Sequence, residues 1–389
     1  MKSAIVILCI GCICSGWTLL SGCKLLPPSP ASGTGTGTAL SPAFTVERRP
    51  FGHVDTGQVW LYTLSNPAGM RVRIMNYGGT LTQVLVPGKG GSLDDLVLGF
   101  DSIAGYLQKD NPYIGALIGR YGNRIAKAQF TLHGQVYRLG ANDHGNSLHG
   151  GWKGFDKKLW TALPAITDSS AALTLAYDSP DGEEGYPGKL HAEVTYELLA
   201  NNALQLTYTA TTDKETPVNL TNHTYFNLSG GREHQILDHV VTLYADQYTA
   251  VNAALIPTGE LPAVRGTPMD FTTGKPVGRD ISLVPGGYDH NFVLRKSGPG
   301  PQLAARVVDP GSGRVLEMYT TEGGVQFYSG NFLDGKLTGK QGFVYGPHAG
   351  FCLEAQHFPD APNQPGFPNS LLKPGEIYRQ VTIYKFSNQ

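Results

Sequence analysis

The feature that most constrains the fold of this chain is the alternation of apolar and polar residues in short segments from Phe44 onward. Successive side chains of a β-strand point to opposite faces, so this spacing predicts strands that each bury one face. The alternation recurs in segments spread over the whole chain: Val59, Leu61 and Thr63; Val72 and Ile74; Leu173, Leu175 and Tyr177; Leu204, Leu206 and Tyr208; Val381 and Ile383.

Turn-forming residues separate these segments. Asn66 to Gly69 (NPAG) predicts a turn between two of the strands, and Asn201-Asn202 predicts another. His133-Gly134 predicts a hairpin between residues 129–132 and 135–139, and the segment 310–313 predicts a second one. The 50 glycines and 26 prolines among the 389 residues agree with a fold rich in tight turns.

Helices contribute little to the predicted fold. The clearest candidate is Ser102–Gln108, with Asp101 as its N-cap. No long amphipathic segment alternates with the strands, which argues against a parallel α/β sheet. We therefore predict an all-β fold in which residues 44–389 form a single large antiparallel β-sandwich.

The first 43 residues have the composition of an export signal followed by a linker. Residues 4–20 are almost wholly apolar after Lys2, and Leu20-Ser21-Gly22-Cys23 resembles the lipobox of a bacterial lipoprotein. That resemblance implies a signal peptide over residues 1–22 and a lipid on Cys23. The alternatives are a plain transmembrane anchor and an ordinary cleaved signal peptide, but the apolar run is short for a membrane span.

Residues 23–43 would then be the lipidated cysteine and a flexible tether. The segment is rich in Pro, Ser, Gly and Thr, which cannot build a core. The expected location is the bacterial cell envelope, facing the periplasm from the outer membrane in a bacterium with two membranes. Only Cys352 remains in the folded part, so no disulfide is expected there.

The charge balance excludes one large class of function. Lys and Arg total 30 against 31 Asp and Glu, and the formal net charge is −1. Proteins that capture nucleic acid rely on many Lys and Arg contacts to phosphate, so no nucleic-acid partner is expected.

Polar residues gather in five segments, where Gly, Asn or aromatic residues surround proton-transfer and hydrogen-bonding groups: 119–124, 146–151, 222–227, 288–292 and 353–358. None of these segments has the ligand spacing of a zinc or calcium site, and none is a nucleophile elbow or a phosphate-binding loop. The remaining class is acid–base chemistry on a neutral, hydroxyl-rich substrate.

From about Phe51 to the C-terminus the chain resembles the aldose 1-epimerase (galactose mutarotase) family. The resemblance implies a large antiparallel β-supersandwich that interconverts the α and β anomers of free hexoses such as galactose and glucose, with no metal or organic cofactor. It rests on seven motifs: NYGGTLTQVLVP (76–87), GNRIAKAQF (122–130), NSLHGGWKGFDKKLW (146–160), NHTYFNLSG (222–230), YDHNF (288–292), VQFYSGNFLDG (325–335) and LEAQHFPDAPNQPGFP (353–368).

The resemblance implies a general base at Glu354, which takes the proton of the anomeric hydroxyl, and a general acid at His223, which protonates the ring oxygen. Without the resemblance, a strand glutamate that faces solvent explains Glu354 equally well, and a structural hydrogen-bonding role is the commoner explanation for a histidine such as His223. An acid that works as imidazolium needs a pKa at or above the working pH, and a neighbouring carboxylate would help to raise the pKa of His223.

Alternation through residues 351–356 adds an independent expectation for the base. It places Glu354 on the strand face that carries Cys352 and Gln356, opposite Phe351 and Leu353. A partly desolvated carboxylate on such a face has a raised pKa, which suits a general base.

The family resemblance also assigns residues that hold the sugar. His149 would both bind the sugar and take part in catalysis. Arg124 could instead form a structural ion pair, and Asp289 could instead form a turn. The full set of expected sugar contacts is Asn123, Arg124, His149, His223, Thr224, Tyr225, Asp289 and Gln326.

Other side chains near the motifs have less definite roles. Trp152, Phe327 and Phe358 could pack against a sugar face, but core packing explains them equally well. His144, His290 and His357 are expected to be structural or surface residues.

The main alternative is a carbohydrate-binding sandwich without turnover, which would not need both an acid and a base. An epimerase of phosphorylated sugars would need an Arg or Lys cluster near the motifs, and none is present there. A glycosidase would need two carboxylates at the scissile bond, whereas the expected pair is one carboxylate and one imidazole.

Overall fold

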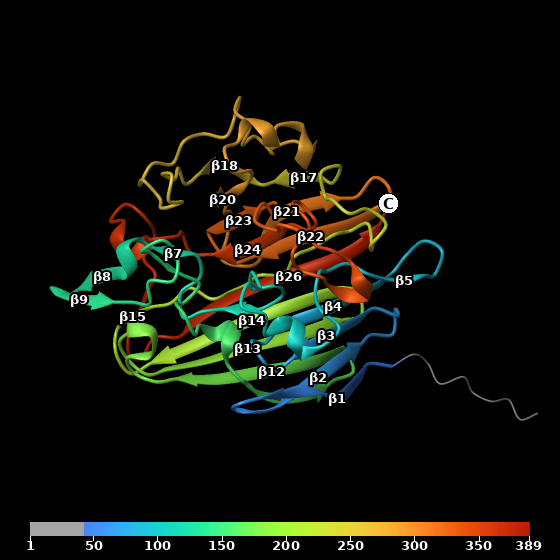
Figure 1. The fold of residues 1–389 in the computed structure, drawn as a ribbon, viewed down its shortest axis with the longest axis horizontal. Helices are drawn as coiled ribbons and strands as arrows, with labels where there is room; N and C mark the ends of the chain where they lie inside the picture. The colour runs from blue at the N-terminus through green and yellow to red at the C-terminus, as the bar shows by residue number, and fades with distance from the viewer. Residues whose placement is uncertain (1–42) are drawn as a thin grey trace, which may run out of the picture. The chain divides into compact units, whose positions relative to one another are not determined.

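Long antiparallel strands form where apolar residues alternate. The computed structural model describes residues 43–389 (Figure 1). The predicted signal peptide, Cys23 and nearly all of the predicted linker therefore lie outside the described residues. Within the described part, no helix is both long enough and apolar enough to cross a membrane.

The largest sheet has nine strands. In spatial order they are β11 (Thr161–Ile166), β12 (Ser170–Ser179), β13 (Leu190–Leu199), β14 (Ala203–Thr212), β26 (Tyr378–Asn388), β22 (Arg314–Thr320), β21 (Gln302–Val308), β17 (Val240–Leu243) and β19 (Lys275–Pro276). The last long strand of the chain, β26, pairs with both β14 and β22 and so joins the two halves of the sheet.

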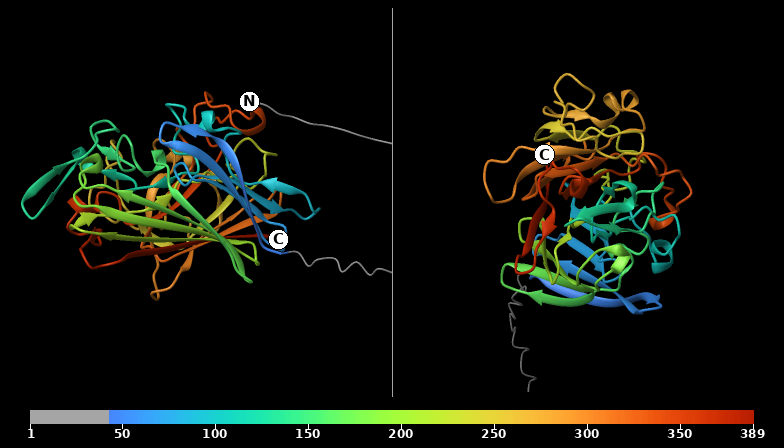
Figure 2. Two further views of the ribbon diagram at one scale, coloured as in Figure 1. Left: turned by 90° about the horizontal axis from the view of Figure 1, so that it is seen from below. Right: turned by 90° about the vertical axis from the view of Figure 1, so that its left-hand side faces the viewer.

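Two further sheets pack against the large one. The five-stranded sheet is formed by β1 (Thr45–Val54), β2 (Gly57–Ser65), β3 (Arg71–Met75), β4 (Leu81–Pro87) and β5 (Leu93–Asp95). The four-stranded sheet is formed by β18 (Ala245–Tyr248), β20 (Asp289–Leu294), β23 (Gly324–Tyr328) and β24 (Cys352–Gln356). Strands β1 and β2 lie against β11 and β12 (Figures 1 and 2).

Short paired strands complete the structure. They are β6 (Leu117–Ile118) with β16 (Thr221–Asn222), β7 (Arg124–Ile125) with β10 (Ser147–Leu148), β8 (Gln129–Leu132) with β9 (Gln135–Arg138), and β15 (Thr216–Pro217) with β25 (Leu371–Leu372). Besides α1 (Ile103–Tyr106), the helical turns are 3-10 turns at Ala126–Ala128, Phe155–Lys157, Glu183–Gly185, Val277–Arg279, Ile281–Leu283, Lys340–Gly342 and Ala361–Asn363.

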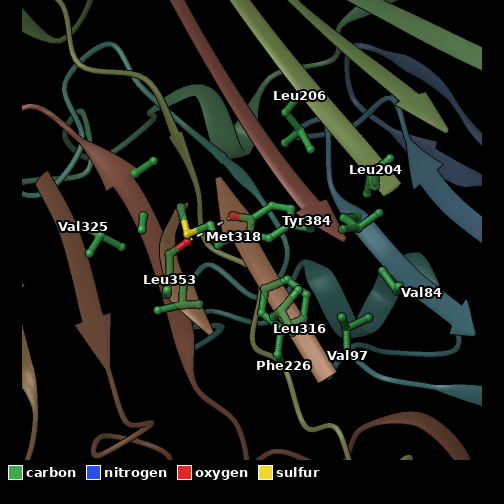
Figure 3. Close-up of a cluster of buried hydrophobic side chains, with 14 of the residues drawn as sticks. Val84, Val97, Leu204, Leu206, Phe226, Leu316, Met318, Val325, Leu353 and Tyr384 are labelled. Carbon is green, nitrogen blue, oxygen red and sulfur yellow. Dashed lines mark hydrogen bonds between the residues drawn. The ribbon is translucent and has the colours of Figure 1, made fainter. Parts of the chain in front are cut away.

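The main hydrophobic core lies where the three sheets meet. Leu204 and Leu206 of β14 and Val84 of β4 point into the same cluster as Val325 and Leu353 of β23 and β24 (Figure 3). The Tyr384 hydroxyl of β26 donates to the carbonyl oxygen of Leu353 at 3.0 Å and so satisfies a polar group inside this core. The all-β sandwich predicted from the alternation is therefore confirmed.

The two predicted hairpins are also present. His133-Gly134 joins β8 to β9, and residues 310–313 join β21 to β22. Both residues of the first turn have positive φ, at +51° for His133 and +78° for Gly134. That conformation suits a two-residue hairpin.

The predicted helix over Ser102–Gln108 is too long, and its predicted cap is wrong. The helix α1 covers only Ile103–Tyr106, and Ser102 rather than Asp101 occupies the N-cap position, without a side-chain cap bond. The carboxylate of Asp101 instead accepts a hydrogen bond from the backbone N–H of Gln341. A long-range contact has therefore replaced the local one that the sequence suggested.

Candidate active site

Most of the predicted site residues converge on one cavity of about 710 Å³. They lie on or beside β7, on β20 and β24, and in the segments that follow β10 and β16. The cavity is lined by Pro112, Tyr113, Asn123, Arg124, Asp143, His144, Leu148, His149, His223, Tyr225, Ala253, Ala254, Leu255, Asp289, Tyr328, Phe332 and Glu354.

The backbone of His223 is held rigidly just after β16. Its N–H donates to the carbonyl of Ala116 at 2.9 Å, and its carbonyl accepts from the N–H of Gly115 at 2.9 Å. The side chain of the preceding Asn222 donates to the Gly115 carbonyl at 3.1 Å. These bonds fix the backbone at His223, so the imidazole has a defined direction into the cavity.

Glu354 occupies the middle of β24, where every residue is buried. Its neighbour Leu353 points into the hydrophobic core (Figure 3), so Glu354 points to the opposite face of the strand. Only 2% of Glu354 is exposed, and its Oε2 atom is buried without a hydrogen-bond partner among the described residues. A buried carboxyl oxygen without a partner is costly, so this position needs a physical explanation, and a group that binds substrate is one candidate.

His223 and Glu354 face each other across the floor of the cavity. The Nε2 atom of His223 lies 3.8 Å from Oε1 of Glu354. Burial lowers the pKa of His223 to about 4, and a hydrogen bond to its own backbone only partly opposes this. Burial raises the pKa of Glu354 well above its ordinary value, Asp289 adds to the rise, and Arg124 opposes it.

The expectation that His223 keeps a pKa at or above the working pH is therefore wrong for this structure. The physical reason is desolvation: the ring packs against Tyr225 and Tyr328, with centroids 5.0 and 6.1 Å away, and little water reaches it. Desolvation thus favours the neutral form of both groups: an uncharged imidazole at His223 and a protonated carboxyl at Glu354. The raised pKa of Glu354, by contrast, agrees in direction with the expectation from its strand face.

His149 is held in one tautomer by the backbone of Asn123. The N–H of Asn123 donates to Nδ1 of His149 at 3.1 Å, and the N–H of His149 donates back to the carbonyl of Asn123 at 3.0 Å. A backbone amide can only donate, so Nδ1 is unprotonated and the proton of the neutral ring lies on Nε2. Burial lowers the pKa of His149 well below its ordinary value, and the nearby His223 and Arg124 lower it further.

This tautomer also bears on metal binding. Ligand atoms of His149, His223 and Glu354 all lie within 4.8 Å of one another, a set that Zn²⁺ could use in principle. A histidine that ligates metal through one nitrogen normally donates a hydrogen bond from the other. His149 has the reverse arrangement, with an accepting Nδ1 and a protonated Nε2, so these three residues are a poor ligand set.

Arg124 is anchored by an acidic partner that the sequence did not single out. Its Nε atom donates to Oδ2 of Asp143 at 2.8 Å, and its Nη1 atom lies 3.9 Å from Oδ2 of Asp289. Burial alone would raise the pKa of Asp143, but Arg124 and His144 lower it overall. The guanidinium is thereby held beside Asp289 as a cation at the cavity wall.

Comparison with known proteins identifies the family of the chain. The sequence model of the aldose 1-epimerase family matches residues 61–385. The chain belongs to the aldose 1-epimerase family.

Named relatives cover nearly the same length. The chain is 51% identical to galactose mutarotase from Bos taurus over 319 residues, which is 82% of this chain and 91% of that protein. It is 49% identical to galactose mutarotase from Homo sapiens over 348 residues, covering 88% and 99% of the two proteins. Identity to aldose 1-epimerase from Escherichia coli (strain K12) is 40% over 334 residues, covering 84% of this chain and 94% of the relative.

Solved structures of the family share the fold. Galactose 1-epimerase from Lactobacillus acidophilus superposes with a TM-score of 0.77 at 29% identity, covering 89% of this chain and 99% of that chain. A homologue from C. elegans superposes with a TM-score of 0.76 at 28% identity over the same shares of the two chains.

Two of the predicted sugar contacts of this aldose 1-epimerase family member do not line the cavity. Thr224 is buried, and its hydroxyl donates to Oδ1 of Asn222, so it stabilises the turn that holds His223. Gln326 lies on β23 opposite Glu354, and its Nε2 atom donates to Oδ1 of Asp289 at 2.7 Å. Local hydrogen bonds direct both side chains to other partners, so the structure does not bring them to the cavity wall with the other predicted residues.

The aromatic residues of the cavity also differ from those suggested by the sequence. Phe327 and Phe358 are buried, and Trp152 is 61% exposed beside a neighbouring cavity that shares the Tyr113 wall. The aromatic walls of the site are instead formed by Tyr113, Tyr225, Tyr328 and Phe332.

Of these four aromatic residues, only Tyr225 was predicted, since it lies in the motif of His223. Tyr328 and Phe332 lie in the motif 325–335, which also contains the predicted sugar contact Gln326. Their nearness to Gln326 in the sequence could have indicated that they belong to the site. Asp143 and His144 immediately precede the motif that contains His149, and together they line the cavity beside Arg124.

Proposed function

We propose that this protein catalyses the interconversion of α and β anomers of free aldohexoses, galactose and glucose among them. The observation that carries the proposal is the approach of His223 Nε2 to Glu354 Oε1 at 3.8 Å, two buried side chains that line the same cavity. Anomer exchange needs one group to take a proton and another to give one at two oxygens on the same carbon. A pair at this separation can serve both oxygens at once.

The reaction proceeds by coupled proton transfers. The carboxylate of Glu354 takes the proton of the anomeric hydroxyl while His223 donates its Nε2 proton to the ring oxygen. The C1–O5 bond then breaks, O1 becomes the aldehyde oxygen, and rotation about C1–C2 presents the other face of the aldehyde to O5. The reverse transfers close the ring, so both residues recover their starting protonation states.

The pKa shifts of the pair are compatible with this scheme. The reactive arrangement is ionised Glu354 with protonated His223, and the arrangement that desolvation favours is protonated Glu354 with neutral His223. Both contain one exchangeable proton, so they are tautomers of a single coupled pair. The reactive tautomer requires only that the proton move from the carboxyl to Nε2, without exchange with solvent.

His149 and Arg124 are assigned to sugar binding in this proposal. The Nε2–H group of His149 is a fixed donor, and Arg124 is a fixed cationic donor beside the acceptor Asp289. Sugar hydroxyls both donate and accept hydrogen bonds, and these residues together offer donors and an acceptor. Because His149 cannot readily release a proton, we assign it to polarising and orienting the sugar rather than to proton exchange.

We further propose that the protein is exported and anchored by lipid at Cys23. The proposal rests on the lipobox-like segment Leu20–Cys23 and the linker composition that follows it. A single acyl chain binds a membrane only weakly and reversibly, whereas two lipid chains attached near Cys23 would anchor the protein stably.

Polarimetry of freshly dissolved α-D-galactose or α-D-glucose tests the catalytic proposal. The purified protein should speed the approach to the equilibrium rotation, and Glu354→Gln should lose this effect while still binding sugar. Sugar binding without faster rotation in the parent protein would favour the non-catalytic sandwich.

A further inference from the structure

His223 lies between two side chains of the same strand face. Cys352 and Glu354 alternate along β24 and point to the same side. The Sγ atom of Cys352 lies 3.5 Å from Nδ1 of His223, and Oε1 of Glu354 lies 3.8 Å from Nε2. One strand therefore places a group at each nitrogen of the imidazole.

The proposed reaction imposes different requirements on the two nitrogens. Nε2 must lose its proton to the ring oxygen and regain it in the reverse step. Nδ1 must keep its proton throughout. A neutral ring carries one proton, and if that proton were not on Nδ1 it would be on Nε2, which could then not take up the proton that it has to donate. The partner of Nδ1 therefore has to accept a hydrogen bond.

We propose that Cys352 is a positioning residue for the general acid. Its sulfur accepts a hydrogen bond from Nδ1–H of His223 and keeps the ring in the tautomer in which Nε2 exchanges its proton. The inference rests on the proposed acid role of His223.

A buried thiol suits this task. Sulfur is a weak acceptor, and the S–H group is a weak donor that does not compete strongly for Nδ1. Burial raises the pKa of the Cys352 thiol well above its ordinary value, and Glu354 and Asp289 raise it further, so the group stays neutral. A neutral partner orients the ring without stabilising the imidazolium as a carboxylate would.

The contrast with His149 supports the assignment. The Nδ1 atom of His149 faces a backbone N–H, which can only donate and therefore retains the proton on Nε2. The Nδ1 atom of His223 faces a sulfur that can accept. The different partners at Nδ1 thus explain why His149 cannot exchange the proton on Nε2, whereas His223 can.

Cys352→Ala and Cys352→Ser form a matched pair for the test. Alanine removes the acceptor, whereas serine keeps a neutral acceptor in a side chain of similar size. The backbone of His223 offers its ring a second hydrogen bond, so we expect a partial effect. In Cys352→Ala, kcat should fall about fivefold to tenfold with KM nearly unchanged, and Cys352→Ser should recover most of the loss.

Nitrogen-15 NMR of the histidine rings gives a readout that does not depend on turnover. The parent and the serine variant should show His223 protonated at Nδ1, and the alanine variant should show a larger share of the Nε2–H tautomer. An unchanged tautomer in Cys352→Ala, or equal kcat in the alanine and serine variants, would overturn the proposal.

The two proposals can fail separately. Should the parent protein not speed anomer exchange, the proposed function fails, while the NMR comparison still reports whether Cys352 sets the tautomer of His223. If the parent is active and Glu354→Gln is inactive, but Cys352→Ala matches the parent in rate and tautomer, only the role of Cys352 is wrong.

Discussion

The imidazole rings of His149 and His223 stand almost perpendicular, with centroids 5.2 Å apart and planes at 89°. Both rings are buried and both have lowered pKa values, yet their Nδ1 atoms face opposite kinds of partner. Under the proposed mechanism, the two histidines of this cavity have different roles. His149 presents a fixed donor, and His223 presents a nitrogen that can exchange its proton.

Glu354→Gln should reduce kcat by about 100-fold or more, because an amide cannot take the anomeric proton. Thermal stability should change little, since the amide has the shape of the carboxyl and burial already opposes ionisation of that carboxyl. Polarimetry and thermal melting check both statements. A variant that keeps more than about a tenth of the parental kcat would remove Glu354 from the role of base.

The parent should show a bell-shaped dependence of kcat/KM on pH, because only the one-proton form of the His223–Glu354 pair is active. Activity should be lost as pH falls through about 4, the pKa of His223, when both groups hold protons and no base remains. Activity should also be lost as pH rises through the raised pKa of Glu354, when both groups are deprotonated and no acid remains.

His223→Asn should remove most turnover and eliminate the alkaline fall. The residual activity should then rise with pH as Glu354 ionises, and sugar affinity should stay within about threefold of the parent. A pH–rate profile with α-D-galactose checks this expectation. An active variant whose alkaline limb matches that of the parent would transfer the acid role to His149.

His149→Asn should weaken binding as well as turnover, with KM raised about tenfold, because the Nε2–H donor to the sugar is lost. Nitrogen-15 NMR of the parent should show Nδ1 of His149 unprotonated, with the neutral ring persisting well below pH 6.5. His133→Asn is a suitable control, since the His133 side chain is 76% exposed on the β8–β9 hairpin and pairs with Glu215. Protonation of Nδ1 in the parent would contradict the fixed tautomer.

Asp143→Ala should raise KM about fivefold to tenfold with a smaller effect on kcat, because Arg124 loses its anchor and is drawn toward Asp289. Asp246→Ala removes a carboxylate from an exposed pair, in which Arg295 Nε donates at 2.8 Å, and should leave KM unchanged. Steady-state kinetics of the two variants separates a local effect at the site from a general effect of charge. Equal KM values in both variants would indicate that Arg124 is held by other contacts.

Cys23→Ser should block lipid attachment and leave a soluble product or an unprocessed precursor. Cys12→Ser changes a cysteine inside the predicted signal peptide and should leave attachment intact. Labelling with a fatty-acid analogue, followed by fractionation of the membranes, measures the difference. Equal labelling and equal membrane abundance of Cys23→Ser and the parent would refute the anchor.

Strand positions could be predicted from the sequence because they depend on local alternation and on turn chemistry. The hairpin at His133-Gly134 and the placement of Glu354 on the face of Cys352 both follow from neighbours along the chain. The alternation at Val381 and Ile383 also located β26 correctly. The fully buried face of that strand, however, carries Gln380, Thr382 and Tyr384, because hydrogen bonds inside the core satisfy their polar groups.

The sequence by itself determined the fold class through alternation, and its motifs supplied the candidate residues for proton exchange. Only the tertiary structure decided their protonation states and partners. Cys352 and His223 are 129 positions apart in the chain, and Asn123 and His149 are 26 apart. Desolvation and the direction of hydrogen bonds depend on which groups the packed sheets bring together. Neither the lowered pKa of His223 nor the fixed tautomer of His149 could therefore be predicted from a local sequence pattern.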